Sequence, residues 1–180
     1  MTTLAVNHVG ITVPDIRAAV RWYSDVFGFR CIMGPRVLRA RAAATAETGS
    51  ILGPEFRVAY QAHLLTDNGV GLELFELLDP TTSPRAEGLG WKDRGPWHVC
   101  FTAPDMEGQL ARIVEAGGEQ VSPITHFVPG MPWALVYARD PWGTVLELMS
   151  HSYAEVFSGW PQAGSLEETE WAPGGRMDGA

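Results

Sequence analysis

The sequence lacks the features that mark disulfide scaffolds and membrane proteins. Its 180 residues contain only two cysteines, Cys31 and Cys100. Their spacing matches neither a metal nor a redox motif, so both are expected to be reduced thiols. No apolar run approaches the roughly 18 residues that a membrane span requires. The first residues also lack the basic-then-apolar pattern of a secretion signal. We therefore expect a cytoplasmic protein that does not interact with a membrane.

Positive charge is scarce as well. Lys and Arg number 13 against 21 Asp and Glu, which gives a net charge of −8. Because nucleic-acid binding depends on clustered positive charge, nucleic acid is not expected as a partner. Arg36, Arg39 and Arg41 are nevertheless close together. They indicate either a solvated loop or a clamp for an anionic substrate group, since guanidinium makes bidentate contacts with carboxylates and phosphates.

The most informative feature that is present is an internal repeat. The phrase NHVGITVPD near the start returns ninety residues later as WHVCFTAPD. A second phrase, GLELF, returns as VLELM near residue 147. Internal repeats of this kind usually mark a duplicated supersecondary unit. The fold is therefore expected to contain two copies of one unit.

Hydrophobic periodicity predicts the same β-α-β-β-β order in both copies. The expected elements of the first copy are a strand at 6–13, a helix at 14–27, and strands at 29–33, 56–65 and 69–78. Those of the second are a strand at 96–103, a helix at 104–116, a short strand at 119–124, and strands at 134–140 and 144–150.

These elements define a first module, 4–78, and a second module, 96–151. The first module contains an insertion at 34–55, which we interpret as a loop with some helix. A linker rich in Pro, Gly and Ser joins the modules at 79–95. A C-terminal tail, 152–180, is either partly disordered or packs on the domain through tryptophans, namely Trp160 and Trp171.

Strand alternation places four polar residues away from the helices. Successive side chains of a strand point to opposite faces, and a helix can bury only the apolar face. His8 and His98 therefore lie on the non-helical face of their strands. Glu73 and Glu147, each flanked by leucines, lie on that face as well.

These four residues form a plausible ligand set for one divalent cation. A carboxylate between leucines is costly to bury unless a partner satisfies it. Two imidazoles and two carboxylates suit Zn, Ni, Co, Fe or Mn and do not choose among them. Taken singly, each residue has an ordinary explanation as a solvent-exposed or hydrogen-bonded side chain. Their matched positions in a repeat favour a metal site made of His8, Glu73, His98 and Glu147.

The segments HVGITVPDIRAAVRWYSDVFGF, GLELFE, HVCFTAPD and RDPWGTVLELMS resemble the vicinal-oxygen-chelate superfamily. That superfamily includes glyoxalase I, methylmalonyl-CoA epimerase, extradiol dioxygenases, and bleomycin and fosfomycin resistance proteins. The resemblance covers residues 4–151. It implies an α+β fold in which two tandem βαβββ modules form an incomplete, U-shaped β-barrel with helices on the outer face.

The resemblance assigns the metal ligands to His8, Glu73, His98 and Glu147. Glu76 is the rival of Glu73, because the phrase E-L-L-D-P resembles an epimerase phrase. A regular strand places Glu76 on the helix side, so Glu73 is preferred, although a bulge would reverse this choice.

The four-ligand pattern is closer to glyoxalase I and the epimerase than to the extradiol dioxygenases. It implies a lyase or isomerase that acts on a small carbonyl or thioester substrate by proton abstraction and enolate stabilisation. Glu147 is the favoured base and Glu73 the alternative. A non-haem iron dioxygenase and a drug- or metabolite-binding resistance protein are the competing interpretations. A homodimer is implied, with the site either within one chain or shared between two.

The sequence also suggests roles for other polar and aromatic residues around this site. We expect His63 to be structural or exposed and His126 to lie in a loop near the pocket mouth. Tyr137 is a candidate for the concave face, where its hydroxyl would be offered to the substrate. The following residues form either an apolar lid or ordinary packing: Phe127, Met131 and Trp133.

Overall fold

The computed structural model describes residues 3–40, 52–84 and 88–158. The first module contains β1 (His8–Thr12), α1 (Ile16–Phe27), β2 (Arg30–Arg39), β3 (Val58–Leu65) and β4 (Gly71–Asp79). The second contains β5 (Val99–Thr102), α2 (Met106–Glu115), β6 (Glu119–Gln120), β7 (Thr125–His126), β8 (Ala134–Arg139) and β9 (Val145–Met149), and is followed by α3 (Tyr153–Ser158).

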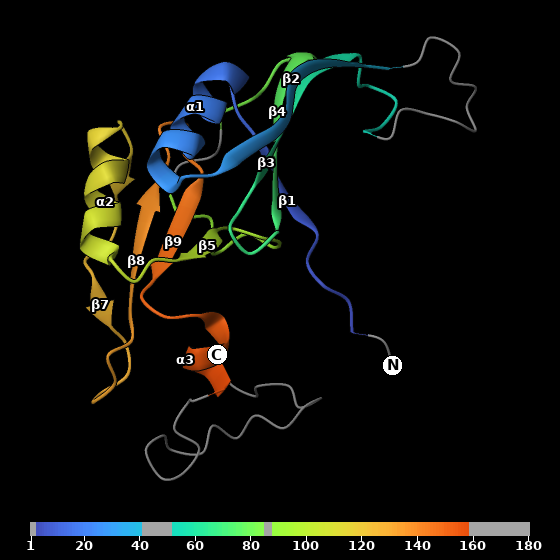
Figure 1. Ribbon diagram of the computed structural model, residues 1–180. Coiled ribbons are helices and arrows are strands. Elements are labelled where there is room, and N and C mark those ends of the chain that lie inside the picture. Colours follow the sequence, from blue (N-terminus) through green and yellow to red (C-terminus); the bar gives the residue numbers. More distant parts are fainter. Residues whose placement is uncertain (1–2, 41–51, 85–87, 159–180) are drawn as a thin grey trace.

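Each module builds its own sheet (Figure 1). The strand orders are β1-β4-β3-β2 and β5-β9-β8-β6, with β7 also paired to β8. β1 runs parallel to β4, and β5 runs parallel to β9. The histidine-bearing start of each module therefore lies beside its glutamate strand. The α+β class and the two modules are confirmed, and the described residues form no closed barrel.

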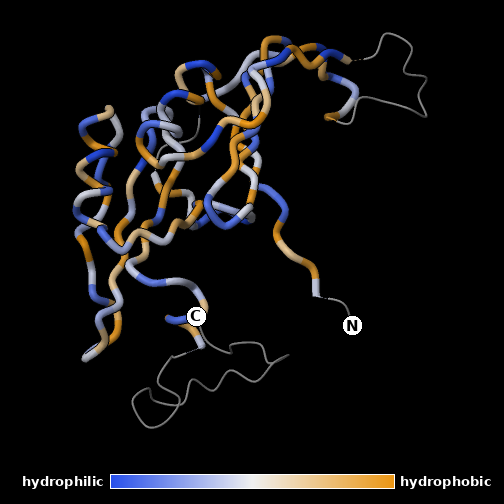
Figure 2. Tube along the Cα trace, in the orientation of Figure 1, coloured by the Kyte–Doolittle hydropathy of each residue, from blue (hydrophilic) through white to orange (hydrophobic). Residues whose placement is uncertain are grey.

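The repeated Pro-Asp dipeptides begin the two long helices. The Asp15 carboxylate accepts a hydrogen bond from the backbone N–H of Ala18 (2.9 Å), and Asp105 does the same for Gly108 (3.0 Å). These contacts satisfy N–H groups that a helix start leaves unpaired. Hydrophilic and hydrophobic residues are interleaved along both helices, as Figure 2 shows, and the buried ones recur every three or four residues, so one side of each helix is apolar.

The modules share one hydrophobic core on their helical sides, which includes buried residues of both helices and both sheets. The Trp22 indole donates to the carbonyl of Ala116 (3.0 Å), and the Gln109 amide donates to the carbonyl of Val26 (2.9 Å). Both hydrogen bonds join α1 to the second module. The non-helical faces of the two sheets therefore lie away from this shared core.

Tyr23 links the modules through a buried hydrogen bond. Its hydroxyl donates to the Asp140 carboxyl (2.8 Å), which also accepts from the backbone N–H groups of Trp142 and Thr144. Burial, and then the Asp140 charge, raise the pKa of Tyr23 well above its usual value.

Replacing Tyr23 with phenylalanine should lower the free energy of unfolding by about 1–3 kcal/mol, because a buried acceptor loses its donor. Urea denaturation at neutral pH measures the change. The matched control is Tyr153→Phe, since the Tyr153 side chain is exposed (76%) and should tolerate the change. Equal midpoints for the two variants would contradict this prediction.

The prediction of a loop from residue 34 is wrong in its first part, because β2 continues to Arg39. Gly34 and Pro35 suggested a strand end, since both residues are unfavourable inside a strand. They are tolerated because β2 is an edge strand whose register shifts between Met33 and Arg36. Residues 41–51 of the predicted insertion lie outside the described residues.

The predicted tail begins with α3, whose Val156 is buried. Trp160 and Trp171 lie outside the described residues. None of the described helices is both long and apolar enough to cross a membrane.

Candidate functional site

The first module brings His8, His63 and Glu73 together. Gly10 of β1 and His63 of β3 are both register partners of Glu73 on β4. The Nε2 atom of His8 is 3.5 Å from Glu73 Oε2, and the Nε2 atom of His63 is 3.5 Å from Glu73 Oε1. The Glu73 side chain is only 16% exposed. The predicted proximity of His8 and Glu73 is therefore observed.

The second module contains the matching pair. The Nε2 atom of His98 is 3.1 Å from Oε2 of Glu147, whose side chain is 9% exposed. Cys100 and Tyr137 are the register partners of Glu147 on either side. Burial, and then Glu147, raise the pKa of Tyr137 to about 12. The same two causes raise the pKa of the Cys100 thiol above its usual value, and this thiol is free.

His63 is the site residue that the sequence reasoning missed. It occupies the same place relative to Glu73 as Tyr137 occupies relative to Glu147. Both pairs show an offset of 74, because 137 − 63 = 74 and 147 − 73 = 74. The first strands repeat at an offset of 90, whereas the glutamate phrases GLELF and VLELM repeat at an offset of 74. The second offset, read from the two glutamates, would have matched His63 with Tyr137.

The environment of His8 favours a positive group between it and Glu73. The His8 Nδ1 atom is 2.8 Å from the side-chain oxygen of Asn7. An amide oxygen can only accept, so Nδ1 carries the proton in this arrangement. The Nε2 atom of a neutral ring then presents a lone pair to a carboxylate oxygen. Two electron-pair donors that face one another suit either a bound cation or a second proton on the imidazole.

Neither carboxylate forms an ion pair with Lys or Arg in the part of the chain that the structure describes. The only Lys or Arg ion pair found there joins Arg139 to Glu119. Within the same residues, the Nδ1 atom of His98 is buried without a hydrogen-bond partner. Imidazole and carboxylate donors on the non-helical face, with little competing positive charge, fit a divalent cation.

The two pairs do not form one cluster within a single chain. Across residues 3–40, 52–84 and 88–158, no group of three or more His, Cys, Asp or Glu side chains is arranged to hold a metal ion. One chain therefore presents two separate histidine–glutamate pairs, His8 with Glu73 and His98 with Glu147, and we call each pair a half-site.

Glu76, the rival of Glu73, lies on the helical side of its sheet. Its Oε2 atom accepts a hydrogen bond from the backbone N–H of Ile16 (2.9 Å), the first residue of α1. A carboxylate at this end of a helix is stabilised by the helix dipole. Strand parity therefore assigned Glu76 to the correct face.

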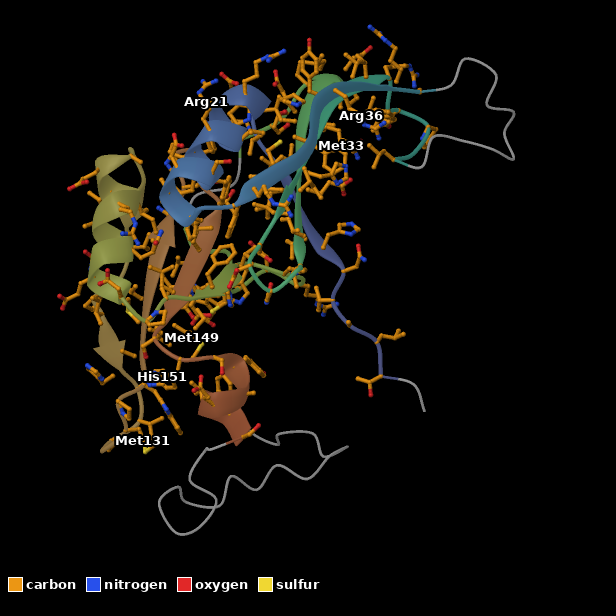
Figure 3. All side chains as sticks on the ribbon, in the orientation of Figure 1. Arg21, Met33, Arg36, Met131, Met149 and His151 are labelled. Carbon is orange, nitrogen blue, oxygen red and sulfur yellow. The ribbon has the colours of Figure 1, made fainter. Side chains whose placement is uncertain are left out.

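The three arginines do not form one clamp. Arg36 pairs with Gln61 and Arg39 pairs with Val58. Strand alternation therefore places Arg36 and Arg39 on opposite faces of β2. Figure 3 shows Arg36 on the first sheet. Arg41 lies outside the described residues.

The predicted lid residues form a small second core. Trp133 is buried together with Val128, Met149 and Val156, and Phe127 and Met131 pack against this group. This arrangement supports ordinary packing, the second of the two interpretations. The prediction of a loop position for His126 is wrong, because this residue lies in β7. It pairs there with Ala134 of β8, and its side chain is exposed.

A pocket of about 590 Å³ lies between β1 and β5. Its lining includes Gly10, Thr12, Trp97, His98 and Trp142. Of the four predicted ligands, only His98 contributes to this lining. The pocket is therefore adjacent to the second half-site and is not centred on either glutamate.

Three comparisons relate the chain to known proteins. A family model for the Glyoxalase/Bleomycin resistance protein/Dioxygenase superfamily matches residues 5–148. A search of curated proteins gave no significant match. Among solved structures, a glyoxalase family protein from Bacillus cereus has a TM-score of 0.62 and 21% identity, over 83% of this chain and 95% of that chain.

Two further structures carry more specific names. A mutant of the fosfomycin resistance protein FosX from Listeria monocytogenes, in complex with Mn(II) and a dihydroxypropylphosphonic acid, has a TM-score of 0.53 and 13% identity, over 86% of this chain and 95% of that chain. A glyoxalase I mutant from Zea mays has a TM-score of 0.53 and 17% identity, over 82% of this chain and 45% of that chain. At such identities the structures show a shared fold. Since the family model spans most of the sequence, the chain belongs to the glyoxalase/bleomycin resistance protein/dioxygenase superfamily.

Proposed function

We propose that the protein is a divalent-metal-dependent lyase or isomerase acting on a small carbonyl or thioester substrate. The observation that carries this proposal is the pairing of a histidine with a poorly exposed glutamate at matched positions of both modules. A fold relative, FosX, has been solved with Mn(II). A cation held by His8, Glu73, His98 and Glu147 would supply Lewis-acid polarisation of a substrate oxygen.

Glu147 is the proposed base that removes a proton beside the carbonyl. It is the less exposed of the two glutamates, and protic side chains, Cys100 and Tyr137, flank it. With a pKa of about 12, the Tyr137 hydroxyl stays protonated at neutral pH and can donate a hydrogen bond to a substrate oxygen. Glu73 is the alternative base.

We also propose that the working unit is a homodimer in which each site combines the first half-site of one copy with the second half-site of the other. The support is that one described chain keeps its two half-sites separate. A two-fold axis would then form two equivalent sites, since both copies present the same surfaces.

Proton abstraction can be tested by exchange in D₂O. Protein loaded with Mn²⁺, Ni²⁺ or Zn²⁺ should exchange the proton beside the carbonyl of a suitable substrate, followed by proton NMR. Suitable probes are the hemithioacetal of methylglyoxal with glutathione and a branched acyl thioester. Glu147→Gln should slow the exchange by about 100-fold or more, because general base catalysis contributes that much.

The control for this experiment is Glu119→Gln, because Glu119 is an exposed glutamate of the same module and its replacement should leave the rate unchanged. Exchange that is insensitive to Glu147 would contradict the assignment of the base. Oxygen uptake by the iron-loaded protein, without exchange, would favour the dioxygenase. Tight binding of an aromatic drug to metal-free protein would favour a resistance protein.

A further inference from the structure

We infer that Gln61 and Arg36 form a relay that positions the carboxylate of Glu73. This inference rests on the proposed function, because it takes Glu73 as a cation ligand. It assigns positioning roles to two residues that the sequence pattern did not connect with the metal ligands.

Two consecutive hydrogen bonds define the relay. The Gln61 side-chain amide donates from Nε2 to Glu73 Oε1 (2.6 Å), and the Arg36 guanidinium donates from Nη2 to Gln61 Oε1 (2.9 Å). Gln61 is a buried polar residue, only 8% exposed. Because a buried amide without partners would be costly, both contacts stabilise this arrangement.

The relay allows only one orientation of the Gln61 amide. A glutamine amide can present either its oxygen or its nitrogen, but guanidinium has donors only. The Gln61 oxygen must therefore face Arg36, and the amide N–H groups must face Glu73. This occupies Oε1 of Glu73 and leaves Oε2 directed at His8, 3.5 Å from Nε2. The carboxylate is thus held with one oxygen presented to the first half-site.

A local irregularity of β2 makes the relay possible. Met33 pairs with His63, whereas Arg36 pairs with Gln61, so the register shifts between them. Without that shift Arg36 would lie opposite Tyr60, whose side chain points to the other face. Gly34 lies within this irregularity, where a Cβ atom would stand 2.5 Å from the backbone oxygen of Gln61. Only glycine allows so close an approach of β2 to β3.

The direction in which cation affinity changes when the Arg36 side chain is removed distinguishes the relay from a purely electrostatic effect of its charge. If Arg36 acted only through its charge, removing it would strengthen cation binding, because like charges repel. If it acts through Gln61, removing it frees the amide to turn and weakens cation binding. The two accounts therefore predict opposite changes for the same variant.

The test titrates Co²⁺ into the wild-type protein and into four variants, and follows both heat and the visible absorption of cobalt, which reports coordination geometry. Gln61→Leu should weaken Co²⁺ binding by about 10-fold or more, as the loss of outer hydrogen bonds typically does. Arg36→Met should also weaken it, and should add no further loss in the Gln61→Leu background. Arg39→Met, the same charge change on the opposite face of β2, is the matched control and should not weaken binding.

The Co²⁺ titrations test the relay and the proposed function separately. Wild-type affinity in Gln61→Leu, or unchanged or tighter binding in Arg36→Met, would overturn the relay while leaving the proposed function in place. If Gln61→Leu does not fold, the exposed Arg36→Met variant still decides. A wild-type protein that binds no Co²⁺ would overturn the proposed function, and with it the role of the relay.

Discussion

Replacing Glu73 with glutamine is expected to weaken the binding of a divalent cation by at least about 100-fold, because a neutral amide replaces the proposed carboxylate ligand. Losing a direct ligand should weaken binding more than losing an outer contact does. The same replacement at Glu76 is expected to leave cation binding unchanged. The two glutamates are three residues apart on one strand, yet Glu73 is 3.5 Å from both His8 and His63, and Glu76 accepts the first N–H of α1.

Isothermal titration of Mn²⁺ or Co²⁺ into both variants measures this difference. Urea denaturation provides the complementary readout, since Glu76→Gln should lower the free energy of unfolding by about 0.3–1 kcal/mol through the lost charge at the helix start. The pair of variants thus separates ligation from helix capping. Loss of cation binding in Glu76→Gln, with retention in Glu73→Gln, would show that the ligand assignment is wrong.

Combining two variants, each unable to bind a cation by itself, in one dimer is expected to restore cation binding if sites are shared between copies. His8→Ala removes the first half-site of a chain, and His98→Ala removes the second. Each variant alone should bind no cation, because every site of its homodimer lacks one histidine. In a mixed dimer, one site combines the intact His8 of one copy with the intact His98 of the other, and it should bind normally.

The mixed dimer can be obtained by co-expression with two different affinity tags. Titration should then give one cation per mixed dimer, compared with two per wild-type dimer. The control is a dimer with the same two affinity tags in which both copies carry His8→Ala. This dimer should bind no cation. An unrestored mixed dimer, together with normal binding by an isolated wild-type chain, would place the site within one chain and contradict the shared arrangement.

Strand periodicity explains why much of the site was predictable. A period of two assigns each strand residue to a face without knowledge of the fold, and this placed Glu73 and Glu76 on opposite sides of β4, as the structure shows. The same reasoning paired His8 with Glu73 and His98 with Glu147. His63 was not predicted because the matched position of the second module holds Tyr137, so no histidine is repeated there.

The relay of Arg36, Gln61 and Glu73 could not be predicted for a different reason. Its existence depends on a one-residue shift of β2 against β3, and that shift depends on contacts between strands that are distant in sequence. Gly34 and Pro35 suggested a strand end, although they mark an irregularity inside an edge strand. A face assignment by alternation fails wherever such a bulge intervenes.

The sequence by itself determined the two-module α+β fold, the helix starts at Asp15 and Asp105, and the faces on which the paired histidines and glutamates lie. These features follow from local rules, since hydrophobic period and capping chemistry act over a few residues. Only the tertiary structure decided that the modules meet through their helical sides, that one chain keeps its two half-sites apart, and that Gln61 contacts Glu73. Those outcomes depend on how whole surfaces pack against one another, and the burial of a shared core sets them.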